Sequence, residues 1–245
     1  MSEDKPRPIY AIVPAAGSGQ RFGGPVPKQY LPLAGLTVIE HSLQRLLPQV
    51  DRIVVALAED DQVFQGLSIA SHAKVEMVVG GDSRSESVQS ALAQLNIGAD
   101  DWVLIHDAVR PLVSKQDLHD LISKLQFHPV GGLLATPVFD TVKRADAERQ
   151  VLQTEDRDGL WLAQTPQMFR YRKLRDALDK NGGDASITDE SMALEKAGYT
   201  VRLIEGSRTN FKITCPEDLQ LAELILSGPS GQKPSFKGQG RADGT

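Results

Sequence analysis

The sequence predicts an α/β protein with a mostly parallel sheet that is flanked by helices. Two observations support this prediction. Short runs of consecutive apolar residues, such as residues 9–13 and 53–57, alternate along the chain with segments whose apolar residues recur at helical spacing. Runs that are apolar throughout are typical of strands covered on both faces, as strands in parallel sheets are. The loops at the carboxyl ends of such strands meet at one edge of the sheet, where ligands bind in this class.

The predicted elements follow one another along a single domain, residues 1–226. Strands are expected at residues 9–13, 53–57, 75–79, 102–105, 131–138 and 201–204. Helices are expected where apolar residues lie three or four positions apart, at residues 39–47, 88–95, 118–125, 171–181 and 189–197, and from Pro216 onward.

Two segments depart from this alternation. Residues 139–160 alternate charged and apolar side chains, which predicts a hairpin or protruding β-arm with little core of its own. Residues 227–245 are rich in Gly, Pro, Ser and charge, which predicts a disordered tail.

Composition excludes several classes of protein. The 245 residues carry a formal net charge of −5, and a broad nucleic-acid surface needs a basic excess instead. Residues 1–8 lack the apolar core of a signal peptide, and no apolar run is long enough to span a membrane. The only cysteine is Cys215, so no intramolecular disulfide can form, and we expect a cytoplasmic protein that binds neither nucleic acid nor membrane.

The loop after the first predicted strand carries the strongest functional pattern. Residues 14–19 read Pro-Ala-Ala-Gly-Ser-Gly, and small residues let a backbone bend sharply and approach a ligand closely. Successive N–H groups at the end of a strand can bind an anion, and Arg21 and Lys28 add two cations. This combination predicts a polyphosphate site, and the alternative is a plain glycine-rich turn with solvated charges.

Two known phosphate motifs do not fit this loop. A dinucleotide fingerprint that begins at Gly17 requires glycine at position 22, where the chain has Phe22. A P-loop requires Gly-Lys-Ser/Thr, whereas Pro25 and Val26 follow Gly24.

Two further loops are expected at the same edge. Residues 80–87 read Gly-Gly-Asp-Ser-Arg-Ser-Glu-Ser, and the two glycines leave room for a flat base whose edge Ser87 could reach. The alternative is that Asp82 or Ser83 only caps the helix that follows.

Residues 106–111 read His-Asp-Ala-Val-Arg-Pro. Asp107 could bind a ribose hydroxyl, a metal or an acceptor substrate, or it could form only a local ion pair with Arg110. We expect His106 to be a packing residue and Cys215 to be inert.

These motifs together resemble the 2-C-methyl-D-erythritol 4-phosphate cytidylyltransferases of the non-mevalonate isoprenoid pathway. The resemblance extends over about residues 9–226. It continues through Asp-Thr-Val-Lys at 140–143, Arg157, Leu-Ala-Gln-Thr-Pro-Gln at 162–167, Thr-Asp-Glu at 188–190, Asn-Phe-Lys-Ile-Thr at 210–214 and Pro-Glu-Asp at 216–218. One departure is Thr209, where the family usually has aspartate, and it bears on how Lys212 is positioned.

The resemblance implies a Rossmann-like fold of the nucleotide-diphospho-sugar transferase type and a homodimer whose arm enters the partner's site. It implies that Arg21 and Lys28 stabilise the transition state and that Mg²⁺ assists, with no protein ligand of the metal specified. CTP would be held by Ala15, Ala16, Gly17, Gly81, Asp82 and Ser87. The acceptor, 2-C-methyl-D-erythritol 4-phosphate, would be bound by Asp107, Arg110, Thr141, Arg157, Thr165 and Lys212.

Three other functions remain open on the sequence. The acceptor could instead be ribitol 5-phosphate or a sugar acid. The chain could be a nucleotide-binding regulatory protein without activity, although Arg21 and Lys28 argue against that. A dinucleotide-dependent oxidoreductase is disfavoured by the glycine spacing.

Overall fold

The protein is built around one seven-stranded sheet with the strand order β11-β7-β10-β6-β1-β4-β5. The structure is a computed structural model that describes residues 7–17, 26–181 and 187–228. All neighbouring strands pair in parallel except β10, which runs antiparallel to both β6 and β7. The strands are β1 Ile9–Pro14, β4 Arg52–Leu57, β5 Val75–Val79, β6 Trp102–Ile105, β7 Gly131–Pro137, β10 Trp161–Arg170 and β11 Arg202–Glu205. The predicted α/β fold class is confirmed.

Helices cover both faces of the sheet, and the side chains of β1 show how. Ala11 and Val13 belong to one buried cluster, whereas Ile12 belongs to another, because successive residues of a strand face opposite sides. The first cluster contains buried residues of α1 and α3, and the second contains buried residues of α2, α4 and α5. The helices are α1 Val38–Leu46, α2 Arg84–Gln94, α3 Lys115–Leu125, α4 Tyr171–Lys180, α5 Glu190–Lys196 and α6 Pro216–Ser227.

Three helices begin at capping boxes whose first residue is serine or threonine, which explains where they start. Thr37, Ser83 and Ser114 each accept a hydrogen bond from a backbone N–H three residues later, and the acidic side chain at that position accepts one in return. Ser83 therefore does cap α2, as one of the alternatives for residues 80–87 supposed.

Strand β10 was not predicted. Its centre reads Gln164-Thr165-Pro166-Gln167, so the polar residues and the proline conceal the apolar pattern of a strand. The polar side chains of β10 can be buried because they form hydrogen bonds with residues in other segments. For example, Gln164 Nε2 donates to Ser207 O over 3.0 Å. The register with β7 shifts between Ala163 and Gln167, which also removes a simple alternation.

Strand β5 differs from the expectation that both faces of each strand are covered. It lies at the edge of the sheet, and the side chains of Met77 and Val79 are exposed. The short elements η2 Lys28–Tyr30, β2 Pro32–Leu33, β3 Leu36–Thr37, η3 Phe64–Gly66 and η4 Ser68–Ser71 were not predicted either.

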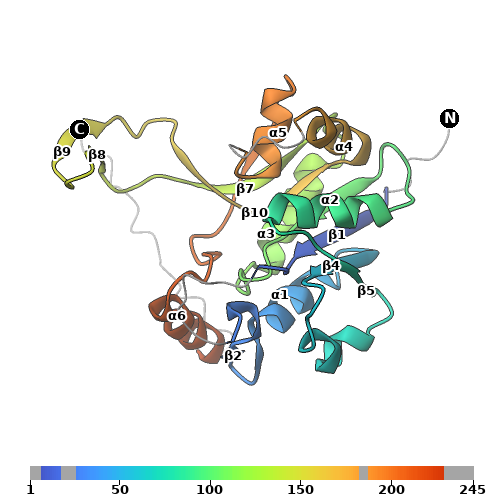
Figure 1. The fold of residues 1–245 in the computed structure, drawn as a ribbon. Helices are drawn as coiled ribbons and strands as arrows, with labels where there is room; N and C mark the ends of the chain where they lie inside the picture. Colours follow the sequence, from blue (N-terminus) through green and yellow to red (C-terminus); the bar gives the residue numbers. More distant parts are fainter. Residues whose placement is uncertain (1–6, 18–25, 182–186, 229–245) are drawn as a thin grey trace, which may run out of the picture.

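Residues 139–160 form the protruding hairpin that the sequence predicted. Strands β8 Val142–Ala145 and β9 Val151–Glu155 make a separate two-stranded sheet that extends away from the body (Figure 1). Ser227, the first residue of the predicted tail, instead ends α6, and residues 229–245 of that tail lie outside the described residues. None of the helices in the described parts has the length and apolar character that crossing a bilayer requires.

Candidate active site

A cavity of about 170 Å³ opens at the carboxyl edge of the sheet, where the loops after β1, β5 and β6 converge as predicted. Its lining residues come from five separate segments: Pro14, Ala15, Ala16, Gly17, Lys28, Gln29, Asp82, Ser83, Arg84, Ser87, Asp107, Ala108, Val109 and Lys212. A second, more open hollow of about 630 Å³ adjoins it and shares Ala16, Gly17 and Asp82. Gly81 borders this second hollow, together with Glu59 and Asp60 of the loop after β4.

The loop after β1 is fixed by Gln29, a residue that was not predicted as part of the site. The buried Gln29 amide donates to the carbonyl oxygens of Ala15, over 2.9 Å, and Gly17, over 3.2 Å. The backbone N–H of Ala15 donates to Ala56 O over 2.8 Å. These bonds hold the small-residue loop at the end of β1, beside Lys28, in the conformation that lines the cavity.

The glycines at 80 and 81 are needed for close approach. A Cβ at Gly80 would lie 2.8 Å from both Ala16 Cβ and Ser87 Oγ, and a Cβ at Gly81 would lie 2.3 Å from Glu86 Cβ. Ser87 is buried, and its hydroxyl accepts from Gly81 N–H over 3.2 Å. The loops after β1 and β5 therefore approach each other closely, which no larger residue at position 80 would allow.

Asp107 is the electrostatic centre of the other side of the cavity. Its Oδ1 lies 2.9 Å from Arg84 Nε, and its Oδ2 lies 3.0 Å from Lys212 Nζ and 3.6 Å from Arg110 Nε. The local pair with Arg110 therefore exists, but it is the longest of the three contacts. Burial alone would raise the pKa of the Asp107 carboxyl, yet the three cations outweigh it and hold that pKa far below its usual range.

His106 and Thr165 are buried residues that connect to Asp107 through hydrogen bonds. The Nε2 atom of His106 lies 3.1 Å from the carbonyl oxygen of Arg110, so Nε2 is the nitrogen that donates. Its Nδ1 then accepts from Thr165 Oγ1 at 3.2 Å, and Thr165 Oγ1 accepts from the N–H of Asp107 at 3.0 Å. Burial lowers the pKa of His106 to about 4, so the ring is neutral at pH 7 and acts as a packing residue, as expected.

The segment that carries Lys212 is tied to the same region. Arg110 Nη1 donates to Asn210 O over 2.7 Å, and Asn210 Nδ2 donates to Thr165 O over 2.8 Å. The resemblance leads one to expect aspartate at position 209. Thr209, which occupies it, forms hydrogen bonds with the hydroxyl of Ser207. Lys212 nevertheless reaches Asp107, so the replacement does not prevent that contact.

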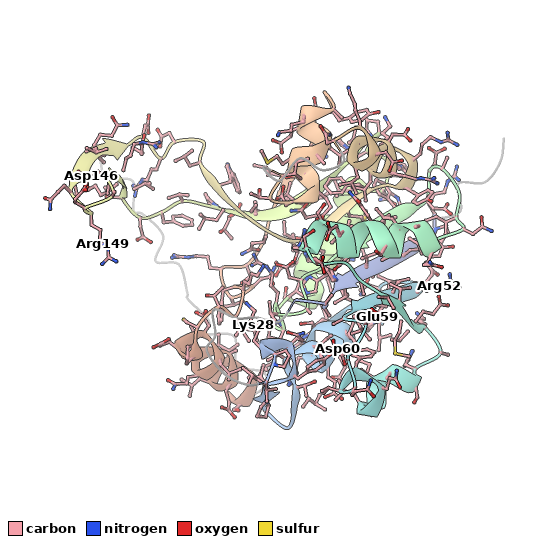
Figure 2. The ribbon with its side chains drawn as sticks, in the orientation of Figure 1. Lys28, Arg52, Glu59, Asp60, Asp146 and Arg149 are labelled. Carbon is pink, nitrogen blue, oxygen red and sulfur yellow. The ribbon has the colours of Figure 1, made fainter. Side chains whose placement is uncertain are left out.

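The remaining predicted site residues lie elsewhere. Arg21 lies outside the described residues. Thr141 and Arg157 are exposed residues at the base of the arm, just outside the paired residues Val142 and Glu155, and neither borders the two hollows described above. Figure 2 shows Lys28 in the body of the molecule, far from Asp146 and Arg149 at the tip of the arm.

Arg84 and Glu190 are functional candidates that the sequence did not single out. Arg84 lines the cavity and contacts Asp107, and Glu190 holds its guanidinium with two hydrogen bonds of 2.7 and 3.0 Å. Both are charged residues in the first turn of a helix, and this position was the one sequence feature that could have marked them as candidates. The sequence around each residue does not indicate that α2 and α5 bring the two together.

Mg²⁺ takes one or two carboxylates together with phosphate oxygens and water. Among residues 7–17, 26–181 and 187–228, no group of three or more His, Cys, Asp or Glu side chains could hold a metal. Both oxygens of Asp107 are engaged by cations, so Asp107 is unsuited to this role. The exposed Asp82 borders both hollows and suits a metal that is bound mainly by a nucleotide's phosphates.

A mostly parallel sheet with a small-residue loop after its first strand, and a cavity with Lys28, Arg84 and Lys212 at its carboxyl edge, define a nucleotidyltransferase fold. The family model described as "2-C-methyl-D-erythritol 4-phosphate cytidylyltransferase" matches residues 9–228. The chain therefore belongs to the 2-C-methyl-D-erythritol 4-phosphate cytidylyltransferase family of nucleotidyltransferase enzymes.

Relatives and solved structures agree with this assignment. The chain is 47% identical over 230 residues to the 2-C-methyl-D-erythritol 4-phosphate cytidylyltransferase of Vibrio vulnificus strain CMCP6, covering 92% of this chain and 97% of that protein. It is 50% identical over 223 residues to the Dechloromonas aromatica protein of the same name, covering 89% and 96%. The crystal structure of the Francisella tularensis 2-C-methyl-D-erythritol 4-phosphate cytidylyltransferase superposes with a TM-score of 0.75 at 36% identity, covering 88% of this chain and 98% of that one.

Proposed function

We propose that the protein transfers CMP from CTP to 2-C-methyl-D-erythritol 4-phosphate, which gives 4-diphosphocytidyl-2-C-methyl-D-erythritol and pyrophosphate for isoprenoid precursor synthesis. The observation that carries this proposal is the cavity in which Lys28, Arg84 and Lys212 adjoin the small-residue loop of residues 15–17. The family match over residues 9–228 supports the choice of substrates. We propose the cytosol as the compartment of the reaction, since the chain carries a single cysteine.

CTP binds, in this proposal, between the loop after β1 and the loop after β5. The residues that hold it are Ala15, Ala16, Gly17, Gly81, Asp82 and Ser87. Backbone acceptors of the Gly80-Gly81 loop can satisfy the amine of cytosine, whereas uracil would present a carbonyl to them. We therefore expect CTP to be preferred to UTP, and a purine to be too large.

The chemical step follows from charge. The acceptor phosphate is already an anionic nucleophile at neutral pH, so its oxygen attacks the α-phosphorus of CTP without a strong general base. The bond from the α-phosphorus to the bridging oxygen breaks in line, and its electron pair leaves with pyrophosphate. Negative charge builds around the five-coordinate phosphorus, and Arg21 and Lys28 stabilise it.

We propose that Mg²⁺ also takes part, because the reaction brings two phosphorylated anions together. When bound to the nucleotide's phosphates, it would supply further positive charge to the polyanion. Asp82 is the residue that we expect to hold it from the protein side, since it borders both hollows.

The acceptor site takes residues from two subunits in this proposal. Asp107, Arg110, Thr165 and Lys212 belong to the body, whereas Thr141 and Arg157 lie on the arm. The arm also exposes apolar side chains, at Phe139, Val151, Leu152 and Leu160, which a second subunit would cover. Symmetric exchange around a two-fold axis gives each site both sets of residues.

A pyrophosphate-release assay with CTP, Mg²⁺ and 2-C-methyl-D-erythritol 4-phosphate tests the function. We expect release of pyrophosphate that depends on both substrates, and a product whose mass equals that of acceptor plus CTP minus pyrophosphate. Parallel reactions contain ribitol 5-phosphate in place of the acceptor, and UTP or ATP in place of CTP. Equal kcat/KM for ribitol 5-phosphate would contradict the proposed acceptor, and equal kcat/KM for UTP would contradict the proposed base recognition.

A further inference from the structure

Arg84 and Glu190 form a buried ion pair that lies beside the active-site cavity. The side chain of Glu190 is 2% exposed and that of Arg84 is 27% exposed. Arg84 Nη1 donates to Glu190 Oε1 over 2.7 Å and Nη2 donates to Oε2 over 3.0 Å. Two parallel bonds of this kind fix the plane and the position of a guanidinium more firmly than a single contact does.

The third nitrogen of the same guanidinium extends the network into the cavity. Arg84 Nε donates to Asp107 Oδ1 over 2.9 Å, and Asp107 Oδ2 lies 3.0 Å from Lys212 Nζ. Arg84 lines the 170 Å³ cavity and also a separate hollow of about 440 Å³ on the α5 side, and Glu190 borders only the latter of the two. Glu190 is therefore linked to the cavity through Arg84.

The residues on both sides of Glu190 are anchored to the central sheet. Glu190 is the first residue of α5, and the preceding Asp189 caps the helix by accepting from Met192 N–H over 3.0 Å. Gln167 of β10 donates to Asp189 Oδ2 over 2.9 Å and accepts from Ser191 N–H over 3.1 Å. The start of α5 is thus fastened to β10 at Gln167, which pairs with Ile105, two residues before Asp107.

We propose that Glu190 is a positioning residue for the transfer reaction, which holds Arg84 so that Asp107 keeps Lys212 in place for the acceptor. The inference rests on the proposed function, in which Asp107 and Lys212 bind the acceptor. Without Glu190, Arg84 is free to turn both of its terminal nitrogens toward Asp107 or toward a substrate phosphate. Either movement displaces Asp107 from Lys212, and a displacement of about 1 Å can cost about a hundredfold in rate.

Glu190→Gln tests this role, because it keeps the size of the side chain but removes its charge. We expect kcat/KM for the acceptor to fall at least about tenfold, while KM for CTP stays within about twofold. Glu195→Gln is the matched control, since Glu195 is exposed on the same helix and should leave both constants unchanged. Glu190→Asp keeps the charge on a shorter side chain and should fall between Glu190→Gln and the wild type.

A double-mutant cycle with Arg84→Met separates positioning from a merely structural role. If Glu190 acts through Arg84, Glu190→Gln should change kcat/KM by less than about twofold in an Arg84→Met protein. The double variant should also melt at a higher temperature than Arg84→Met alone, because that single change leaves a buried carboxylate unpaired.

Additive losses in the cycle would overturn the proposal, and so would a Glu190→Gln enzyme that is indistinguishable from wild type. Equal rises in KM for acceptor and CTP would overturn it as well. If the wild-type enzyme uses a different phosphorylated acceptor, the proposed substrate is wrong, and the same constants measured with that acceptor still decide the role of Glu190.

Discussion

Lys28 Nζ donates a hydrogen bond to the carbonyl oxygen of Ile213 over 3.2 Å, although 185 residues separate the two in the chain. Ile213 directly follows Lys212, so this bond joins the loop that precedes α1 to the segment that carries the second lysine of the cavity. If the proposed site is correct, Lys28 therefore links the residues assigned to the nucleotide with those assigned to the acceptor.

Lys28→Ala should reduce turnover much more than stability. Removing a cation that stabilises developing charge costs about 3 kcal/mol in the transition state, or about a hundredfold in kcat. The bond to Ile213 is made to a backbone carbonyl at a half-buried position, so the melting temperature should fall much less than turnover does. Steady-state kinetics and a thermal melt on the same preparation check this. Arg21→Ala should behave in the same way, and near-normal kcat in both variants would refute the catalytic assignment.

Mixed dimers should reveal whether the arm acts on the partner subunit. Arg157→Ala and Lys28→Ala chains should each be nearly inactive alone, whereas co-expressed chains form some dimers with one intact site. We expect partial recovery of pyrophosphate release in the purified heterodimer. Arg149→Gln, an exposed change on the same arm, serves as the control and should be active by itself. Heterodimers that form and stay inactive would show that the site is not shared.

Acid stability should depend on His106. Burial lowers the pKa of this histidine to about 4, from the usual value of 6.5 that it regains on unfolding. The unfolded chain therefore binds more protons between these two values, so the free energy of unfolding should decrease as pH falls from about 6.5 to about 4. The shift corresponds to at most about 3 kcal/mol.

Urea unfolding at a series of pH values measures the contribution of His106. His106→Gln should unfold with a shallower pH dependence in this window than the wild type does. His119→Gln, at an exposed position of α3, should leave the wild-type slope unchanged. Equal slopes in all three proteins would mean that His106 titrates in the folded state as it does in the unfolded one.

Arg170 should stabilise the end of the sheet that is remote from the site. Its guanidinium donates to the carbonyl oxygens of His128, Asp100 and Gln126, and it lies 3.8 Å from the centre of the Trp102 ring. Arg170→Met should lower the free energy of unfolding by about 2–3 kcal/mol. The measurement is urea unfolding, with the exposed Arg172→Met as control, and kcat at 25 °C should not change in either variant.

The sequence predicted those elements whose signal is local. Residues 102–105 coincide with β6, because an uninterrupted apolar run identifies a strand without reference to the rest of the chain. Residues 75–79, which are apolar except for Glu76, likewise coincide with β5. It did not predict β10, because Gln164 and Gln167 are polar and are buried only through partners such as Ser207 and Asp189.

The same distinction applies to the site. The small-residue loop and Lys28 are close in sequence, so the sequence alone could predict that they belong to one phosphate site. Arg84 and Glu190 are 106 residues apart, and nothing in the sequence around either one predicts that they form an ion pair. Contacts made by the folding of distant segments are therefore the part of this site that only the structure supplies.

The place of β10 in the sheet has a consequence for synthesis on the ribosome. Strands β1, β4, β5 and β6 pair with one another and need no residue after Ile105, so they can assemble early. The other edge of β6 stays open until residues 167–170 have been made, because β10 is the strand that covers it. A growing or stalled chain therefore presents an unpaired edge to its neighbours, which makes it prone to aggregation. Slow translation of the second half of the message would lengthen that exposure and increase the dependence of the nascent protein on chaperones.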